Sequence, residues 1–375
     1  MQILDKYLIR QFLFSLLFSL IAFWVIFLVV DLVEHLDTFI DRHATFFTVV
    51  KYYFYYTPYI MVLSLPVAML LSCLFSLGQL AKHHELLAMK STGISLYRIL
   101  LPLFGLAFLV SLITIVFGGA IVPFTYQKMM EVKTVEIGKE TKGKSFLHRN
   151  VFVQAEDGTI FHLDVYNSKK KTGSGVLVQK FEKNRLKEEV QAKKMSWTKA
   201  GWVFENGRER IFTNSSSEPV MPESATSAEQ AGVEKYDTFD RRLRPDLKIK
   251  PEVFAQRQKK PEEMGYFELS EYVKIKKRSG QVVAKETTDL YLKISFPFVN
   301  FIIVLFGAPL TANPKRSGVA IGFAISLFIS FVYYTLIRMG QSFGYSEKLP
   351  PLLAAWSANI LFAVLGTMLL IKAKK

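Results

Sequence analysis

The chain has 375 residues, of which 50% are hydrophobic and 14% are aromatic, and its formal net charge is +15. Such a composition excludes an ordinary soluble domain. The positive charge does not indicate a nucleic-acid-binding protein, because many of the lysines and arginines flank apolar segments. The single cysteine, Cys73, lies inside one of these segments, so no disulfide is expected.

Six apolar runs, each near the 20 or so residues that one bilayer crossing requires, predict six transmembrane helices. They are Phe12–Val30, Tyr55–Leu77, Ile99–Phe124, Leu290–Leu310, Val319–Ile337 and Leu352–Ile371. The first run follows Lys6 and Arg10, as a signal peptide would. It is too long for a signal peptide, however, and acidic residues follow it instead of a small-residue cleavage site. We therefore expect a retained helix.

The lysines and arginines of the short loops predict the orientation of the helices in the membrane. Basic residues gather before the first run, between the second and third, between the fourth and fifth, and after the sixth, whereas the opposite loops are acidic or sparsely charged. These residues are Lys6, Arg10, Lys82, Lys90, Arg98, Lys315, Arg316, Lys372, Lys374 and Lys375. We expect both termini in the cytoplasm and the stretch Tyr126–Thr287 outside it.

The polar middle of the chain predicts a β-rich domain. Its short alternating runs are Val151–Ala155, Thr159–Tyr166, Val176–Phe181, a stretch ending at Trp197, Gly201–Phe204 and Glu209–Phe212. Asp157-Gly158 and Asn206-Gly207 are hairpin signals. The near-regular spacing is typical of a sandwich or a jelly roll. Thr213–Gly232 has no periodicity and predicts a mobile loop, whereas Phe267–Arg278 predicts a helix capped by Ser279-Gly280.

Residues Gly138–Ser145 match the phosphate-binding pattern GxxxxGKS. That pattern binds phosphate where a buried strand leads into the loop and a helix begins at its Lys-Ser. Here a charged segment precedes the match and a strand-like segment follows it, so we favour a basic connector. The six histidines lack metal-ligand spacing and no G-x-S-x-G motif occurs. We therefore expect no catalytic residue, no metal site and no cofactor.

The loop between the second and third runs, Gly78–Tyr97, has a helical pattern over about residues 79–92. The pattern stops at Ser91-Thr92-Gly93, which is a C-terminal cap signal. At 100° per residue, Lys82, Glu85 and Met89 fall on one arc, and Leu80, His84, Leu87 and Ala88 on another. A helix docking into a cytosolic partner and an interfacial helix lying on lipid both fit this pattern.

Four segments have a recognisable order and spacing along the chain. They are Leu4–Phe12 (LDKYLIRQF), His84–Ser95 (HELLAMKSTGIS), Leu269–Gln281 (LSEYVKIKKRSGQ) and Phe306–Tyr334 (FGAPLTANPKRSGVAIGFAISLFISFVYY). None of them is a catalytic signature. Together they resemble the LptF/LptG permeases of the lipopolysaccharide-export ABC transporter.

The resemblance implies a mainly α membrane protein with six transmembrane helices (3+3) and an inserted periplasmic β-jellyroll-like domain. Its domains would be residues 1–125, including a cytoplasmic coupling helix at about 79–92, then 126–287 and 288–375. The protein would lie in the bacterial inner membrane and would pair with a second permease of the family or with itself. It would have no enzymatic activity of its own, because a cytosolic ATPase dimer would hydrolyse the ATP.

In this family lipopolysaccharide leaves the inner membrane and passes to periplasmic β-jellyroll bridge proteins. The chain would take part in this transfer as the permease. Two alternatives remain at this point, a membrane-anchored periplasmic binding or assembly module with no ATPase partner, and an intramembrane enzyme.

The resemblance also assigns roles to individual residues. Glu85, Met89 and Gly93 match the family's ATPase-coupling loop, and Lys82 lies beside them. The first and fifth transmembrane helices would border a lipid cavity. Its candidate residues are Phe23, Phe27, Asp31, Tyr334 and Arg338.

One position departs from the family pattern. Some members have a basic residue near the outer end of the first helix, where it contacts lipid phosphates, and this chain has Asp31 there. A carboxylate would need a bridging cation or a basic partner such as Arg338 to face a phosphate. We therefore do not transfer a phosphate-binding role to this helix, and we expect Arg338 to be the nearest fixed positive charge to the phosphate.

Overall fold

The computed structural model describes residues 3–137, 147–155, 157–182, 185–198, 200–212, 233–247, 249–254, 259–311 and 319–373. The phosphate-loop match Gly138–Ser145 and the predicted loop Thr213–Gly232 lie outside these ranges. The chain divides into two compact units. One unit comprises Met1–Gly138, Pro261–Val273 and Val283–Lys375, and the other comprises Lys139–Lys260 and Lys274–Val282.

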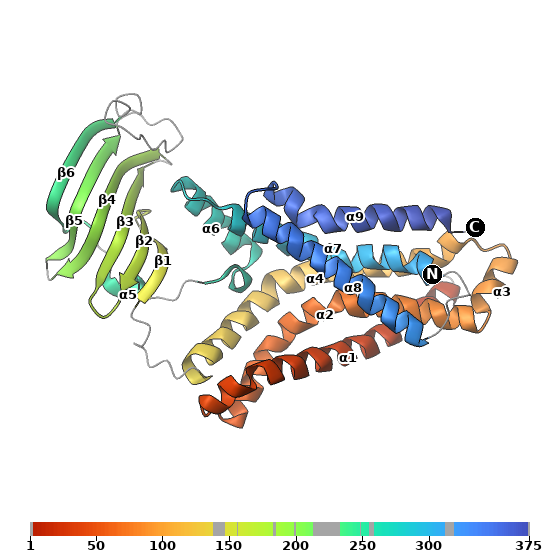
Figure 1. Cartoon of the computed structure of the whole chain (residues 1–375). Helices are drawn as coiled ribbons and strands as arrows, with labels where there is room; N and C mark the ends of the chain where they lie inside the picture. The colour runs from red at the N-terminus through yellow and green to blue at the C-terminus, as the bar shows by residue number, and fades with distance from the viewer. Residues whose placement is uncertain are drawn as a thin grey trace. The chain divides into compact units, whose positions relative to one another are not determined.

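The first unit is helical (Figure 1). Its elements are α1 (Ile3–Asp41), α2 (Phe46–Lys82), α3 (Glu85–Ser91), α4 (Leu96–Glu131), the π-helix η1 (Val132–Ile137), the 3-10 helix η4 (Pro261–Glu263), α7 (Ala284–Thr311), α8 (Val319–Tyr345) and α9 (Pro351–Lys372). Six of the described helices, α1, α2, α4, α7, α8 and α9, are long and apolar enough to cross a membrane. The prediction of six transmembrane helices is therefore confirmed.

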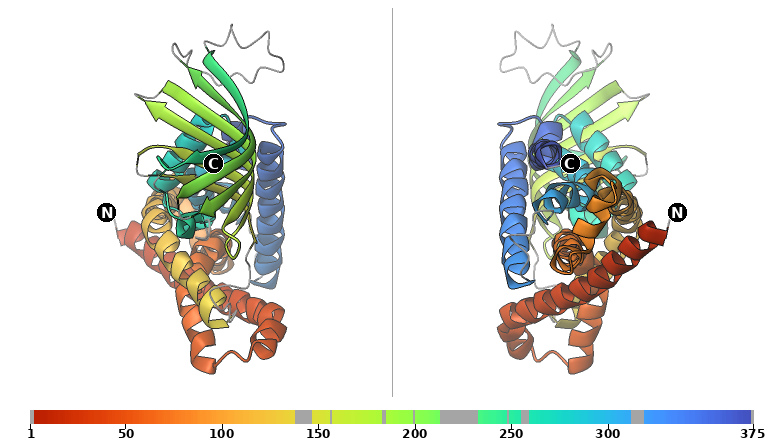
Figure 2. Two further views of the ribbon diagram at one scale, coloured as in Figure 1. Left: turned by 90° about the vertical axis from the view of Figure 1, so that its left-hand side faces the viewer. Right: turned by 90° about the vertical axis from the view of Figure 1, so that its right-hand side faces the viewer.

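Most of these helices extend beyond the apolar runs that predicted them. α1 continues past Val30 to Asp41, and the chain turns before α2 where His43 has a positive φ of 47°. α2 lies inside the unit and contacts α1, α4, α7 and α8. α1 is mostly exposed and runs along the outside (Figure 2). The charged residues after Val30 end the apolar run without ending the helix, because acidic residues are compatible with helical backbone.

Small residues allow the helices of this unit to approach closely. A Cβ atom at Gly366 of α9 would lie 3.0 Å from the backbone of Phe306 in α7. One at Gly340 of α8 would lie 2.5 Å from the carbonyl oxygen of Ala354 in α9. These contacts fix α7, α8 and α9 against one another, and α7 and α8 carry most of the polar site described below.

The second unit contains the β domain. Its strands are β1 (Leu147–Gln154), β2 (Ile160–Asn167), β3 (Thr172–Glu182), β4 (Arg185–Thr198), β5 (Gly201–Phe212) and β6 (Val233–Arg244). They form a six-stranded antiparallel sheet in the order β1-β2-β3-β4-β5-β6. The predicted inserted β domain is confirmed. Its described strands form one consecutive sheet, whereas a sandwich would divide them between two packed sheets.

The two hairpin signals have different outcomes. Asp157-Gly158 joins β1 to β2, and the Asp157 carboxylate accepts a 3.0 Å hydrogen bond from the backbone of Thr159. The prediction of a hairpin at Asn206-Gly207 is wrong, because β5 continues through both residues. Asn206 has a left-handed φ of 52°, so the signal marks a bend inside a long strand.

The bend at Asn206 is one of several irregular positions that lie side by side on the strands of the sheet. Asn150 in β1, Gly175 in β3 and Asn206 in β5 all have positive φ and lie at the level where the pairing of neighbouring strands skips one residue. Residues i and i+3 of a regular strand face opposite sides of the sheet. Leu163 and Tyr166 nevertheless share one buried apolar cluster, which indicates that the sheet bends between them.

A short segment covers this apolar cluster. It contains α5 (Pro251–Phe254), whose Phe254 is fully buried with its ring 5.4 Å from each of the rings of Phe161, Tyr166 and Trp202. After the sheet, α6 (Tyr266–Arg278) matches the predicted helix Phe267–Arg278. Gly280 follows with φ 73°, and its N–H donates to the carbonyl of Lys277, so the predicted cap is confirmed.

Candidate functional site

The corner between α2 and α4 is the first candidate site. The continuous helix expected at about 79–92 is divided, because α2 ends at Lys82 and α3 begins at Glu85. His84 between them has a left-handed φ of 57°. α3 ends in a Schellman motif in which Ile94 donates to the carbonyl of Met89 and Gly93 has φ 84°. The predicted cap is confirmed.

The break between the helices changes the predicted faces of this corner. Lys82 is exposed at the end of α2 and does not share a helical arc with Glu85 and Met89. The predicted apolar face is wrong, since Leu87 is 65% exposed while Leu86 is 4% exposed. Leu86 and Met89 pack against the helical core. The left-handed residue redirects the chain, so α3 does not continue the periodicity of α2.

The start of α1 contacts this corner. The Tyr7 hydroxyl donates a 2.9 Å hydrogen bond to Glu85. Arg98 at the start of α4 forms a bidentate ion pair with the buried Asp5, with N–O distances of 2.9 and 3.1 Å. The segments that carried the resemblance, Leu4–Phe12 and His84–Ser95, therefore contact each other in the fold.

The candidate lipid-cavity residues Phe23, Phe27 and Tyr334 belong to one apolar cluster formed by the helices. Phe23 is buried and stacks on Phe323 of α8, with ring centroids 6.5 Å apart. Phe27 is partly buried against the helical core. Tyr334 and Arg338 line a cavity to which α1 contributes no residue. The lining of this cavity thus includes Tyr334 and Arg338 but not Phe23 or Phe27, and the lipid cavity along α1 and α8 stays a prediction.

Asp31 has partners other than Arg338. Its carboxylate accepts a 3.0 Å hydrogen bond from Tyr53 and lies 3.5 Å from Nδ1 of His35. The other ring nitrogen of His35 lies 3.3 Å from Nζ of Lys133 in η1. Neutral His35 can hold both contacts by donating from Nδ1 and accepting at Nε2. Asp31 is therefore held in a local polar chain that joins α1, α2 and η1.

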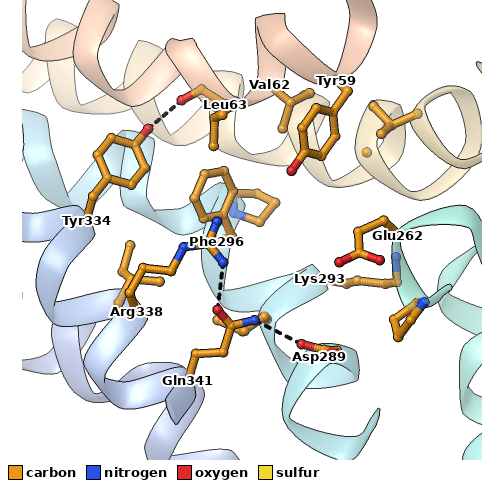
Figure 3. A pocket seen from close by; sticks show the side chains of 16 residues that line it. Tyr59, Val62, Leu63, Glu262, Asp289, Lys293, Phe296, Tyr334, Arg338 and Gln341 are labelled. Atoms are coloured by element: carbon orange, nitrogen blue, oxygen red, sulfur yellow. Dashed lines mark hydrogen bonds between the residues drawn. The ribbon is translucent and has the colours of Figure 1, made fainter. Parts of the chain in front are cut away.

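The cavity at Tyr334 and Arg338 has a volume of about 210 Å³ and is lined by α2, α4, η4, α7 and α8 (Figure 3). Its apolar wall comes mainly from valine, leucine, isoleucine, phenylalanine and proline side chains. The polar lining side chains are Tyr59, Glu262, Asp289, Lys293, Tyr334, Arg338 and Gln341. The Tyr334 hydroxyl donates to the backbone carbonyl of Leu63, which fixes α8 to α2.

A hydrogen-bonded chain runs along one side of the cavity. Arg338 donates to Gln341 over 2.8 Å, and Gln341 donates to Asp289 over 3.0 Å (Figure 3). The Tyr345 hydroxyl also donates to Asp289, over 2.5 Å. Lys293 lies one helical turn after Asp289, and Figure 3 shows it pointing toward Glu262 of η4.

Sequence reasoning missed Asp289, Lys293 and Glu262 as site residues. Asp289 and Lys293 are spaced i and i+4 at the edge of an apolar run, which places both on one helix face. That spacing could have marked them. Nothing local marks Glu262, because it approaches α7 from a separate segment. An apolar wall beside charged side chains can hold a molecule with an apolar chain and a polar head.

Six membrane-crossing helices in two sets of three, with a β domain inserted between the sets, define a multi-pass membrane protein. The chain belongs to the family of lipopolysaccharide export system permeases LptF/LptG, whose model matches residues 6–372. The family consists of transport permeases, and the chain is accordingly a multi-pass inner-membrane protein.

Two curated relatives have the same degree of similarity to this chain. The lipopolysaccharide export system permease protein LptG of Escherichia coli strain K12 is 25% identical over 313 residues, which cover 82% of this chain and 81% of that protein. LptG of Escherichia coli O6:H1 strain CFT073 gives the same values.

Proposed function

We propose that the chain is a permease subunit of an ABC transporter that extracts lipopolysaccharide from the inner membrane and passes it to a periplasmic bridge. A separate cytosolic ATPase dimer supplies the energy. The match to the family over residues 6–372 carries this proposal. In this assignment the β domain is periplasmic, both termini are cytoplasmic, and a second permease of the family, or a second copy, completes the pair.

The α2–α4 corner is the proposed docking site for the ATPase. Glu85 is only half-buried, and its charge lies at the start of α3, where a helix N-terminus favours a carboxylate. Met89 and Gly93 fix the position of α3 by packing and by the cap, respectively. Lys82 supplies a neighbouring exposed charge. The ATPase then contacts Glu85 and moves α3 as it binds ATP.

The lipid path runs along α1 and α8 in this proposal. The aromatic rings of Phe23 and Phe27 contact acyl chains when α1 and α8 separate at the Phe23–Phe323 stack. Arg338, an exposed residue of α8 that also lines the cavity, provides positive charge for a phosphate. Asp31 stays bonded to Tyr53 and His35, and we assign it no phosphate contact.

Copurification with a cytosolic ATPase tests the proposal against a membrane-anchored periplasmic module. The tagged full chain, extracted from membranes in detergent, should bring down an ATPase, and Glu85→Lys should weaken that association. Losing a charge partner at an interface typically costs about 2–5 kcal/mol. Glu347→Lys in the turn between α8 and α9 is the matched control and should behave like the wild type. A wild-type chain that purifies without an ATPase would support the periplasmic module instead.

A further inference from the structure

Lys293 is an ionisable residue inside a membrane-crossing segment, and it faces the cavity. Charged residues at such positions are costly and are usually paired or functional. Within the described part of the chain, no carboxylate lies within the 4 Å of Nζ that an ion pair requires. Figure 3 shows Lys293 pointing toward Glu262, and Asp289 lies one helical turn before it on α7. Lys293 therefore faces carboxylates without forming a close ion pair with them.

The two acids near Lys293 differ in how they are held. Asp289 accepts hydrogen bonds from Gln341 and Tyr345, so its oxygens have fixed partners. Among the described residues, no hydrogen bond or close ion pair holds the Glu262 carboxylate. η4 is instead attached through its backbone, because Gln127 of α4 donates to the carbonyl of Glu263 over 2.5 Å. Glu262 can therefore turn away from Lys293 without releasing η4.

The rest of the cavity is apolar. Val62, Val122, Leu292 and Phe296 form its wall beside Lys293 and Arg338. Its volume of about 210 Å³ exceeds the ~150 Å³ of an engineered apolar cavity that binds benzene. The cavity is therefore large enough for part of one apolar chain. Its head would lie between two cations, with Glu262 as the replaceable anion.

We propose that this cavity binds a single-chain amphiphile with an anionic head, a phosphate or a carboxylate, whose charge contacts Lys293 and Arg338 and displaces Glu262. The site lies within one permease chain. It rests on the proposed function in one respect, because the proposed function also assigns Arg338 to an anionic group of the lipid. Lys293 therefore raises the affinity for the ligand. Glu262 lowers it, because the ligand takes the place of the Glu262 carboxylate.

Binding of radiolabelled dodecyl phosphate to the purified full chain in dodecyl maltoside micelles tests this site. Lys293→Gln should lower the affinity about tenfold or more, since it removes a charged hydrogen-bond donor. Glu262→Gln should raise the affinity about threefold or more, since it removes the competing anion. Lys348→Gln, exposed in the turn between α8 and α9 and outside the cavity lining, should leave binding unchanged. Lys293→Arg should retain binding, and it keeps the test usable if Lys293→Gln does not fold.

Several results would overturn the site. If Glu262→Gln weakens binding of the probe or leaves it unchanged, Glu262 is a structural residue of the cavity and does not compete with the ligand. Displacement of the probe by inorganic phosphate at equal concentration would mean that the apolar wall contributes nothing. Insensitivity of binding to Lys293→Gln would mean that the micelle alone takes up the probe. Each of these results leaves ATPase copurification unaffected, so failure of this site is distinguishable from failure of the proposed function.

Discussion

Tyr7 in α1 donates a 2.9 Å hydrogen bond to Glu85, the first residue of α3. The two residues are 78 positions apart in the sequence. Their contact joins the helix that we place along the lipid path to the corner that we propose as the ATPase-docking site. The Asp5–Arg98 ion pair holds the same end of α1 to α4. A displacement of α3 is therefore expected to move α1.

The Tyr7 hydroxyl provides a test of this connection. Tyr7→Phe removes the hydrogen bond and keeps the charge of Glu85, so ATPase association should remain while ATP-driven lipid release slows. A hydrogen bond of this kind contributes about 1 kcal/mol, which corresponds to about fivefold in rate. Release of lipopolysaccharide from proteoliposomes, compared with ATP hydrolysis by the same sample, measures the effect. Equal release by Tyr7→Phe and wild type would show that α1 does not depend on this contact.

Gly93 is predicted to act through its backbone. Its φ of 84° lies in the left-handed region, and no atom lies within 4 Å of the place where a Cβ atom would be. Gly93→Ala should therefore strain the cap without a steric clash, at a cost of about 1–2 kcal/mol. Gly93→Asn should be milder, because asparagine tolerates this conformation. ATPase copurification should fall in the order glycine, asparagine, alanine. Equal defects in both variants would instead mean that any side chain at this position blocks the ATPase.

His162 in β2 predicts a pH dependence in the β domain. Burial lowers the pKa of His162 and the nearby Lys276 adds to this effect, whereas Asp164 opposes it. The neutral ring also contacts Asn150 over 2.8 Å. Because the folded state disfavours the proton, this stabilisation is complete above the ordinary pKa of about 6.5 and is lost as the pH falls through the lower folded value.

Hydrogen exchange in the full chain measures this effect. After correction for intrinsic rates, the amides of β1 and β2 should exchange faster as the pH falls from about 6.5 towards 5. His162→Gln should flatten this response, and His148→Gln on the neighbouring strand should retain it. A response that persists in His162→Gln would assign the pH dependence to another group.

The sequence predicted the six helices and the inserted β domain because each depends on a local pattern. An apolar run such as Phe12–Val30 marks a membrane crossing whatever it packs against. The break at His83-His84 could not be predicted in this way, since neither glycine nor proline marks it. The charged strand β6 was also missed. Its arginines Arg242 and Arg244 pair with Glu209 on β5, a contact that only the sheet creates.

The candidate sites divide in the same way. Gly93 was predictable as a cap because the signal lies within one turn. The cavity was not, since its charges come from three separate segments. Lys293 lies on α7, Arg338 on α8 and Glu262 on η4. A bridging cation or a base such as Arg338 was considered as the partner of Asp31, and the structure gives Asp31 the partners Tyr53 and His35.

The last prediction concerns the lipid path along α1 and α8. A charge-assisted contact contributes about 1.5–3 kcal/mol, so Arg338→Glu should slow lipopolysaccharide loading strongly. Asp31→Ala should have less effect, because Asp31 is already bonded to Tyr53 and His35. Photo-crosslinkers at Phe27 and at Tyr334 should both label lipopolysaccharide. The control position is Leu361, which is 45% exposed on α9 and should remain unlabelled. Equal labelling at all three positions would mean that lipopolysaccharide reaches these helices only from the surrounding bilayer. The lipid path would then lie elsewhere.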